Sequence, residues 1–280
     1  MARIMTVAAM VALVLAMTTG AQAVSANGAV ADLDMRTTLT CSDGLILTFV
    51  PGHGANAAYA YVYQDVGGVV QQKTDGENGW NDSQSYSASA SLSNSSAHGS
   101  VTVNTAGFDY SIHADGMVQG LNVGDYGKTL GYAYAWPDWL RTDHAGTATF
   151  TIEYAYTLDT TQTVADAEAY VYMNAFFANH VGTNYLTAKE EWTLGYGSNP
   201  NTSLVKYNDS IEAGQYVTVT DSVSWDVGIP STSEPNNWWS TWSYGEAGVE
   251  VAPTPEPATM LLVGSGLVGL LGVIRRRRTK

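Results

Sequence analysis

The sequence Tyr59-Ala60-Tyr61-Val62-Tyr63 places an aromatic ring at every second position, with a small aliphatic residue between the rings. Successive side chains of a β-strand point to opposite faces of a sheet, so this two-residue period predicts a strand with one aromatic face. The same period recurs in residues 85–93, 108–112, 132–136, 150–156, 170–172 and 216–220. No long stretch shows the 3.6-residue period of an amphipathic helix. We therefore expect a chain built from strands.

Turn-forming residues separate these stretches. They are Gly67-Gly68, Asp75-Gly76, Asn78-Gly79, Asp115-Gly116, Gly124-Asp125 and Asn199-Pro200. Short strands between such signals predict an all-β fold over residues 24–244, an antiparallel β-sandwich of jelly-roll-like topology. Aromatic residues on one face of adjacent strands could form a tyrosine ladder. We favour tyrosines packed at the edge of the core, with their hydroxyls in water, over a ligand platform.

Charge excludes one large class of function. The 280-residue chain has 12 basic and 26 acidic residues, and six of the basic ones lie at its two ends. Residues 24–256 hold every acidic residue and only six basic ones, a net charge of −20. A nucleic-acid binder that neutralises phosphates needs a basic surface, so we expect no nucleic-acid partner. Cys41 is the single cysteine, which excludes a disulfide framework within the chain.

The N-terminal 23 residues have the order of an export signal. Arg3 provides a positive start, residues 4–17 are apolar, and Ala21-Gln22-Ala23 is a small-x-small cleavage site. We expect a signal helix over residues 1–23, recognised by the export machinery and cleaved after Ala23. The alternative is a buried N-terminal helix.

The C-terminal residues predict a single transmembrane helix. Residues 258–274 carry no charge, and 17 residues at about 1.5 Å each cover about 25 Å, the thin end of a bilayer span. Arg275, Arg276, Arg277 and Arg278 follow, which places this end in the cytoplasm and the bulk of the chain outside it. A buried core helix is the alternative. Before the helix, residues 245–254 are interpreted as a flexible linker.

The motif ahead of this helix is specific. Pro255-Glu256-Pro257, a short glycine-rich apolar stretch and a terminal arginine cluster occur in that order over residues 253–280. Together they closely resemble the PEP-CTERM sorting signal of bacterial exported proteins. The resemblance implies that an exosortase, a membrane protease, recognises Pro255, Glu256 and Pro257 and removes the helix, with Arg275 to Arg278 as the stop-transfer cluster. It also implies a destination at the cell surface or in an exopolysaccharide-rich biofilm matrix.

A second aromatic cluster suggests a ligand. In an extended conformation Trp238, Trp242 and Tyr244 share one face, with Ser240 between them, while Trp239 points the other way. Flat indoles beside hydroxyl and amide groups suit a sugar ring, which offers an apolar face and polar rims. The alternatives are a closing strand with buried aromatic side chains, or tryptophans at the membrane interface.

Catalytic and metal motifs are sparse. The histidines at positions 53, 98, 113, 144 and 180 form no His-Glu-x-x-His or His-x-His pair, so we expect no zinc site, and a Gly-x-Ser-x-Gly elbow is absent. Carboxylates for glycoside hydrolysis are present by type only. They are Asp166, Glu168, Glu190 and Glu191. Asp138, Asp143 and His144 also lie close together in the sequence, and a polar loop explains them as well as an acid–base site does. Residues 75–82 resemble a calcium loop but fail its order, so we favour a surface turn, with a Ca²⁺ site as the alternative.

These observations favour an exported, non-enzymatic surface or extracellular-matrix protein. It would begin as an inner-membrane-anchored precursor with its ectodomain outside the cytoplasm and then reach the cell surface. The expected partners are an exosortase, the export machinery and, as a candidate, exopolysaccharide. The alternative is a carbohydrate-binding module or glycan-active enzyme that uses the aromatic face.

Overall fold

The computed structural model describes residues 28–42, 44–49, 54–79, 84–104, 108–137, 140–142, 145–163, 166–181, 195–196, 203–229 and 237–252. The predicted signal helix, with Ala21 and Ala23, lies outside these ranges. So do the sorting motif Pro255 to Pro257, the predicted transmembrane helix and Arg275 to Arg278. Within the described ranges, no helix is long and apolar enough to cross a membrane.

Strands make up the secondary structure of the described residues. They are β1 (Ala29–Cys41), β2 (Leu47–Phe49), β3 (Gly54–Val66), β4 (Val69–Gly79), β5 (Ser85–Ser91), β6 (Ser95–Asn104), β7 (Asp109–Val118), β8 (Tyr126–Pro137), β9 (Leu140–Thr142), β10 (Gly146–Asp159), β11 (Ala167–Val181), β12 (Gly195–Tyr196), β13 (Ser203–Glu212), β14 (Tyr216–Ile229) and β15 (Asn237–Val251). Each alternating stretch of the sequence lies in one of them or overlaps it.

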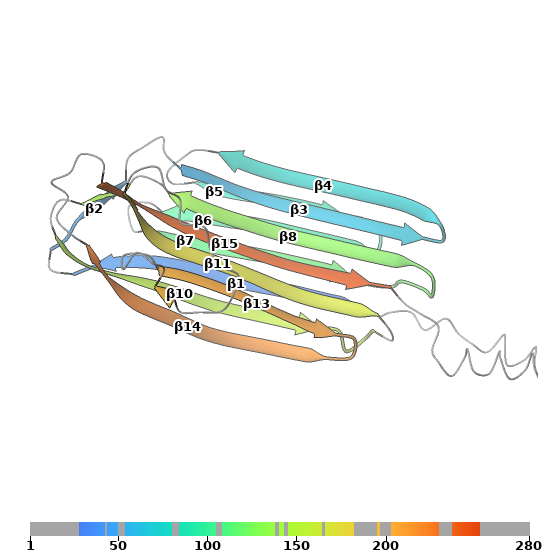
Figure 1. Ribbon diagram of the computed structural model, residues 1–280. Helices are drawn as coiled ribbons and strands as arrows, with labels where there is room; N and C mark the ends of the chain where they lie inside the picture. Colours follow the sequence, from blue (N-terminus) through green and yellow to red (C-terminus); the bar gives the residue numbers. More distant parts are fainter. Residues whose placement is uncertain are drawn as a thin grey trace, which may run out of the picture.

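The strands form two antiparallel sheets that pack face to face (Figure 1). The six-stranded sheet has the order β14-β10-β1-β7-β6-β5. The nine-stranded sheet has the order β12-β13-β11-β15-β8-β3-β4, with β9 pairing to β15 and β2 to β9. This arrangement confirms the all-β antiparallel sandwich, while the jelly-roll topology stays a prediction.

The two-residue period determines which side chains face the core. On β3, Ala58, Ala60 and Val62 are buried between the sheets, and the intervening tyrosines are half-buried on the outer face. Burying apolar area contributes about 25 cal/mol per Å², so a register shift of one residue would expose the buried set and is strongly disfavoured.

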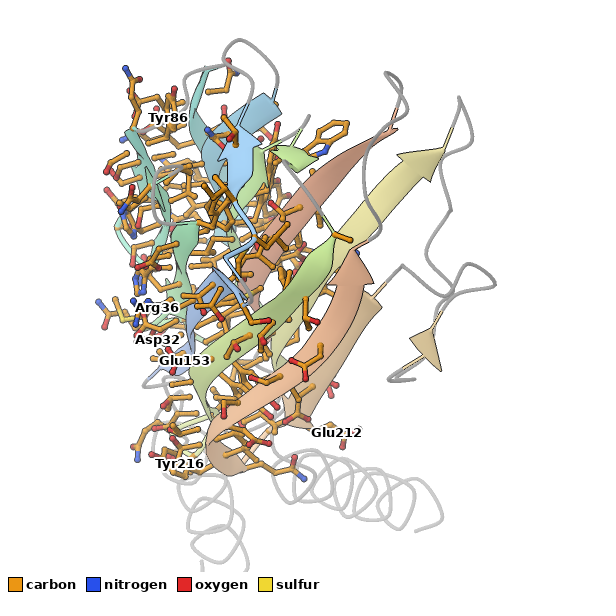
Figure 2. All side chains as sticks on the ribbon, turned by 90° about the vertical axis from the view of Figure 1, so that its left-hand side faces the viewer. Asp32, Arg36, Tyr86, Glu153, Glu212 and Tyr216 are labelled. Atoms are coloured by element: carbon orange, nitrogen blue, oxygen red, sulfur yellow. The ribbon has the colours of Figure 1, made fainter. Side chains whose placement is uncertain are left out.

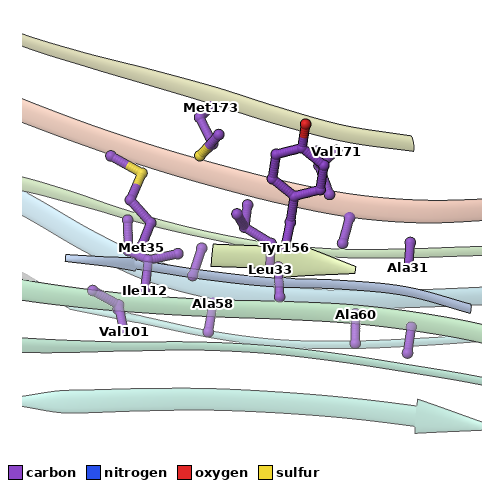
Figure 3. Close-up of a cluster of buried hydrophobic side chains, with 14 of the residues drawn as sticks. Ala31, Leu33, Met35, Ala58, Ala60, Val101, Ile112, Tyr156, Val171 and Met173 are labelled. Carbon is purple, nitrogen blue, oxygen red and sulfur yellow. The ribbon is translucent and has the colours of Figure 1, made fainter. Parts of the chain in front are cut away.

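The spacing between the two sheets is smaller where β8 crosses β6 and β7 than it is near β10 and β11. Where β8 crosses β6 and β7, a Cβ at Gly131 would lie 2.0 Å from the carbonyl oxygen of His98 and 2.6 Å from that of Asp115. Only glycine fits there, because backbone lies directly opposite. Towards β10 and β11 the core holds larger side chains, among them Leu33, Tyr156 and Met173 (Figure 3).

Hydrogen bonds between side chains also link the two sheets, and two of them lie in this core. The Ser243 hydroxyl of β15 donates to the Thr37 hydroxyl of β1 at 2.9 Å, with both residues buried. The Tyr156 hydroxyl of β10 donates to a carboxylate oxygen of Asp209 on β13 at 2.5 Å. Each bond satisfies polar groups that would otherwise be costly to bury.

Several predicted turns are instead parts of strands. Gly67 and Gly68 do form a two-residue hairpin turn, with φ values of 59° and 78°. Residues 75–79 belong to β4, and Asp115-Gly116 to β7, so the interpretation of 75–82 as a surface turn is wrong for its described part. The carboxylates of Asp75 and Glu77 accept hydrogen bonds, both at 2.9 Å, from the backbone N–H groups of Ser89 and Ser87 on β5. They therefore protect the edge of the six-stranded sheet at β5.

The predicted linker over residues 245–254 is also wrong up to Val251. β15 continues to that residue, and Ala247, Val249 and Val251 are fully buried. The reason is that the small and aliphatic residues at alternate positions after Tyr244 continue the inward face of the strand. The folded part thus extends to within four residues of Pro255.

Candidate functional site

The predicted aromatic site lies partly on the outer face of the nine-stranded sheet. Trp242 and Tyr244 are consecutive outward residues of β15 and are half-buried. Trp238 belongs to the same strand, where its backbone pairs with His180 of β11, but its side chain is outside the described part. The expectation that the last strand presents aromatic residues on one face is thereby confirmed for Trp242 and Tyr244.

Rings from four adjacent strands form one row across this face. Tyr59 of β3 stacks on Tyr132 of β8 with 4.9 Å between ring centroids and 29° between ring planes. Tyr132 stacks on Tyr244 of β15 at 5.7 Å, and Tyr172 of β11 meets Tyr244 edge-on at 5.7 Å. This row is the tyrosine ladder that the alternating sequence predicts.

A second row includes the tryptophans. Trp242 stacks on Tyr134 at 5.1 Å and 18°, and meets Trp136 edge-on at 5.6 Å. Trp242 also lies parallel to Tyr244, which joins the two rows. We call these seven residues the aromatic face: Tyr59, Tyr132, Tyr134, Trp136, Tyr172, Trp242 and Tyr244.

The stacking decides which atoms of the aromatic face meet solvent. Tyr132 stacks on Tyr59 on one side and on Tyr244 on the other, so both of its ring surfaces are engaged within the row. The atoms of such a ring that reach solvent are those of its edge and its hydroxyl. The aromatic face is therefore a rigid surface of apolar C–H edges and phenol groups rather than a set of free ring platforms.

Carboxylates border the aromatic face. The Tyr244 hydroxyl donates a hydrogen bond to Glu246. Glu246 also lines a shallow depression of about 400 Å³ with Glu168, Tyr170, Tyr172 and Ser210. Burial, followed by the negative charge of Glu246, raises the pKa of the Tyr244 and Tyr170 phenols well above the usual range. These phenols therefore stay neutral and act as hydrogen-bond donors.

The remaining predicted carboxylates divide into two groups. Glu168 lies at the aromatic face, whereas Asp166 is an exposed residue just before β11. Glu190, Glu191, Asp138, Asp143 and His144 lie outside the described residues. Glu246 was missed by sequence reasoning, although its spacing of two from Tyr244 places it on the same face of the strand.

Comparison with known proteins identifies only the C-terminus. Residues 253–278 match the family model of the PEP-CTERM protein-sorting motif. The match confirms the resemblance seen in the sequence, and the motif implies an exported protein that is processed by an exosortase, a membrane protease. No curated protein matches the chain significantly in sequence.

Proposed function

We propose that this exported chain is a non-enzymatic surface or extracellular-matrix protein that binds neutral exopolysaccharide through its aromatic face. The continuous ring surface over four strands carries the proposal. Polysaccharide chains are long, so a flat extended surface suits them better than a closed pocket. Their sugar units offer C–H groups for the ring edges and hydroxyls for the phenols and for Glu246.

Charge favours a neutral polymer. The net charge of −20 over residues 24–256 repels an acidic polysaccharide, unless a divalent cation bridges the two. The basic side chain of Lys128 lies on the same outer face, but its charge is neutralised by an ion pair with Glu250, with 3.0 Å between Nζ and Oε2. A neutral glycan avoids the electrostatic cost.

Binding tests the first half of the proposal. The purified full-length protein is titrated with neutral exopolysaccharide from the host and with an acidic polysaccharide at the same mass concentration. We expect saturable binding to the neutral polymer and a loss of at least about tenfold in Trp242→Ala, because a few aromatic side chains dominate the binding energy of such contacts. Tyr216→Ala is the matched control, since Tyr216 is 56% exposed on β14 of the other sheet.

Two outcomes contradict this assignment. Absence of binding to either polymer would leave the aromatic face with a structural role only. Equal loss in Trp242→Ala and Tyr216→Ala would show that the contact is not made by the aromatic face. Circular dichroism of each variant separates lost binding from lost folding.

A deletion in the sorting motif tests the proposed route of export. The proposed route runs from the signal peptide through a membrane-anchored precursor to the cell surface, with removal of the C-terminal helix on the way. Deleting Pro255 to Pro257 is expected to leave an unprocessed chain in the membrane fraction, measured as intact mass. An unchanged mature mass would contradict recognition through this motif.

A glycan-active enzyme is the second candidate, and one observation favours it. Glu168 and Glu246 line the same depression, beside two tyrosines, and glycoside hydrolysis needs two carboxylates flanking the scissile bond. A reducing-end assay on the binding samples decides between the two. Our proposal expects no new reducing ends, whereas release that disappears in Glu246→Gln would establish hydrolysis.

A further inference from the structure

A group of metal-ligating side chains lies on the outer face of the six-stranded sheet. His98 is on β6, and His113 and Asp115 are on β7. His98 and Asp115 are direct cross-strand partners, and His113 is two residues from Asp115 on the same strand. All three side chains therefore point to the same side of the sheet, opposite to the core.

Their spacing fits a tetrahedral cation. A carboxylate oxygen of Asp115 lies 3.0 Å from His113 Nε2 and 3.5 Å from His98 Nδ1. All three ligand atoms lie within 4.8 Å of one another. With zinc–ligand bonds of about 2.0–2.1 Å, tetrahedral geometry separates neighbouring ligand atoms by about 3.3–3.4 Å. The two measured distances lie on either side of that value.

The second nitrogen of each histidine has a partner, which is an independent feature of metal sites. His113 Nδ1 lies 2.9 Å from a carboxylate oxygen of Asp34 on β1. His98 Nε2 lies 3.1 Å from the Ser87 hydroxyl on β5. Histidine ligands almost always donate their other N–H to a carboxylate, carbonyl or hydroxyl, which fixes the ring and directs the other nitrogen at the metal. Both rings here are held in that way.

The surroundings favour a cation and let it enter. Asp32 of β1 adds a third carboxylate, 3.7 Å from His113 Nδ1. The side chains of His98, His113 and Asp115 are each 33% exposed, so an ion reaches them from solvent. Figure 2 labels Asp32, Arg36 and Glu153, which all lie on this outer face. A depression of about 700 Å³ lined in part by Asp34, Ser100 and His113 leaves room for a fourth ligand.

We propose that His98 Nδ1, His113 Nε2 and Asp115 bind a divalent transition-metal ion, with Zn²⁺ as the best fit and the fourth position open to solvent. Two nitrogen ligands and one oxygen suit Zn²⁺, whereas Ca²⁺ requires six to eight oxygen ligands. Asp34 and Ser87 are positioning residues that orient the two imidazoles. The ion connects β6 and β7 directly, and β1 and β5 through hydrogen bonds. This site is on the sheet opposite to the aromatic face and is independent of the proposed function.

The test is a Zn²⁺ titration of the full-length protein, purified without a histidine tag and dialysed against chelator. Affinity is measured by competition with a chromophoric chelator, and Co²⁺ substitution reports coordination geometry in the visible spectrum. We expect one Zn²⁺ per chain and a tetrahedral Co²⁺ spectrum without a thiolate band, since Cys41 is not a ligand. His98→Ala and Asp115→Asn are each expected to weaken binding at least about 100-fold, and Asp34→Asn about 10- to 100-fold.

Asp226→Asn is the matched control. Asp226 is another carboxylate of the same sheet, hydrogen-bonded to Thr149 on β10 at 2.7 Å, and its loss should leave Zn²⁺ affinity within about threefold of the wild type. Asp115→Asn keeps the shape of its side chain, so it tests the site even if His98→Ala folds poorly. The proposal is overturned if neither ligand variant changes Zn²⁺ affinity, if the wild type retains no Zn²⁺ at micromolar concentration, or if Ca²⁺ displaces Zn²⁺ at equal concentration.

Discussion

Replacing Gly131 with alanine tests whether the sheets meet as closely as the structure shows. The new Cβ would lie 2.0 Å from the carbonyl oxygen of His98 and 2.6 Å from that of Asp115. Real Cβ contacts are essentially never shorter than 3.0 Å, so β8 must move away from β6 and β7 by about 1 Å. Both obstacles are backbone atoms, which cannot rotate away as a side chain would.

The expected cost follows from that displacement. Overpacking a core costs about 1–3 kcal/mol and occasionally more, and two backbone clashes place Gly131→Ala at the upper end, at about 3 kcal/mol. The gain from restricting the unfolded chain offsets only about 0.4–1 kcal/mol of this. The net cost is then about 2–2.6 kcal/mol. A domain of this size shifts in Tm by about 2–4 °C per kcal/mol, so we expect Tm to fall by about 4–10 °C.

Gly228→Ala is the control for the chemical change itself. Gly228 lies on the edge strand β14, and a Cβ there would meet no atom within 4 Å. The free energy of unfolding of Gly228→Ala should stay within about 0.5 kcal/mol of the wild-type value or rise slightly, because the substitution restricts only the unfolded chain. Thermal and urea denaturation of both variants are followed by far-ultraviolet circular dichroism. Equal Tm values for Gly131→Ala, Gly228→Ala and the wild type would refute the close approach of the sheets.

Three further predictions concern an ion pair, a buried hydrogen bond and the ladder. Hydrogen bonds from Arg36, at 2.8 and 2.9 Å, hold the pKa of the Asp109 carboxyl below its usual range, so the pair stabilises the fold above the ordinary carboxyl pKa and the contribution is lost as the pH falls. On acidification below about pH 4, the free energy of unfolding of Arg36→Gln should therefore fall less than that of the wild type, as measured by urea denaturation. The same pH dependence in both proteins would contradict the pairing. Ser243→Ala should cost about 1–3 kcal/mol by leaving the buried Thr37 hydroxyl unsatisfied, and adding Thr37→Val should recover most of that loss; additive losses in the double variant would argue against the bond. Tyr132→Ala should cost about 1–3 kcal/mol, because the two ring contacts contribute about 0.5–1.5 kcal/mol each, whereas Tyr132→Phe should stay close to the wild type in thermal denaturation.

Local sequence patterns predicted the strands and the sorting signal of the protein. The aromatic alternation at residues 59–63 and 132–136 reports which side of a strand faces the core, a property that depends only on neighbouring residues. The sorting motif is likewise a short linear signal that an enzyme reads in an extended chain, so Pro255 to Pro257 could be recognised without any fold. Stacking between tyrosines was expected wherever two such strands are adjacent, and Tyr59 and Tyr132 are cross-strand partners on β3 and β8.

Glycine shows where local reasoning failed. The pairs Asp75-Gly76 and Asp115-Gly116 have turn chemistry, but the strands continue through both. A Cβ at Gly116 would lie 2.5 Å from the Thr129 hydroxyl of the opposite sheet, so the residue is glycine because another strand crosses there. That crossing is set by residues distant in sequence, and no window along the chain contains it.

The cluster of His98, His113 and Asp115 likewise depends on strand pairing between residues distant in sequence. The sequence lacks a zinc motif because local motifs place two ligands on one helix turn or in one hairpin loop, whereas here the ligands come from paired strands. His113 and Asp115 share a face through their spacing of two, which the sequence already determined. Only the register of β6 against β7 places His98 opposite Asp115, and only the pairing of β1 and β5 at the two flanks adds Asp34 and Ser87. Side-chain direction is a local property of a strand, but strand order and register are fixed by the burial of the whole core.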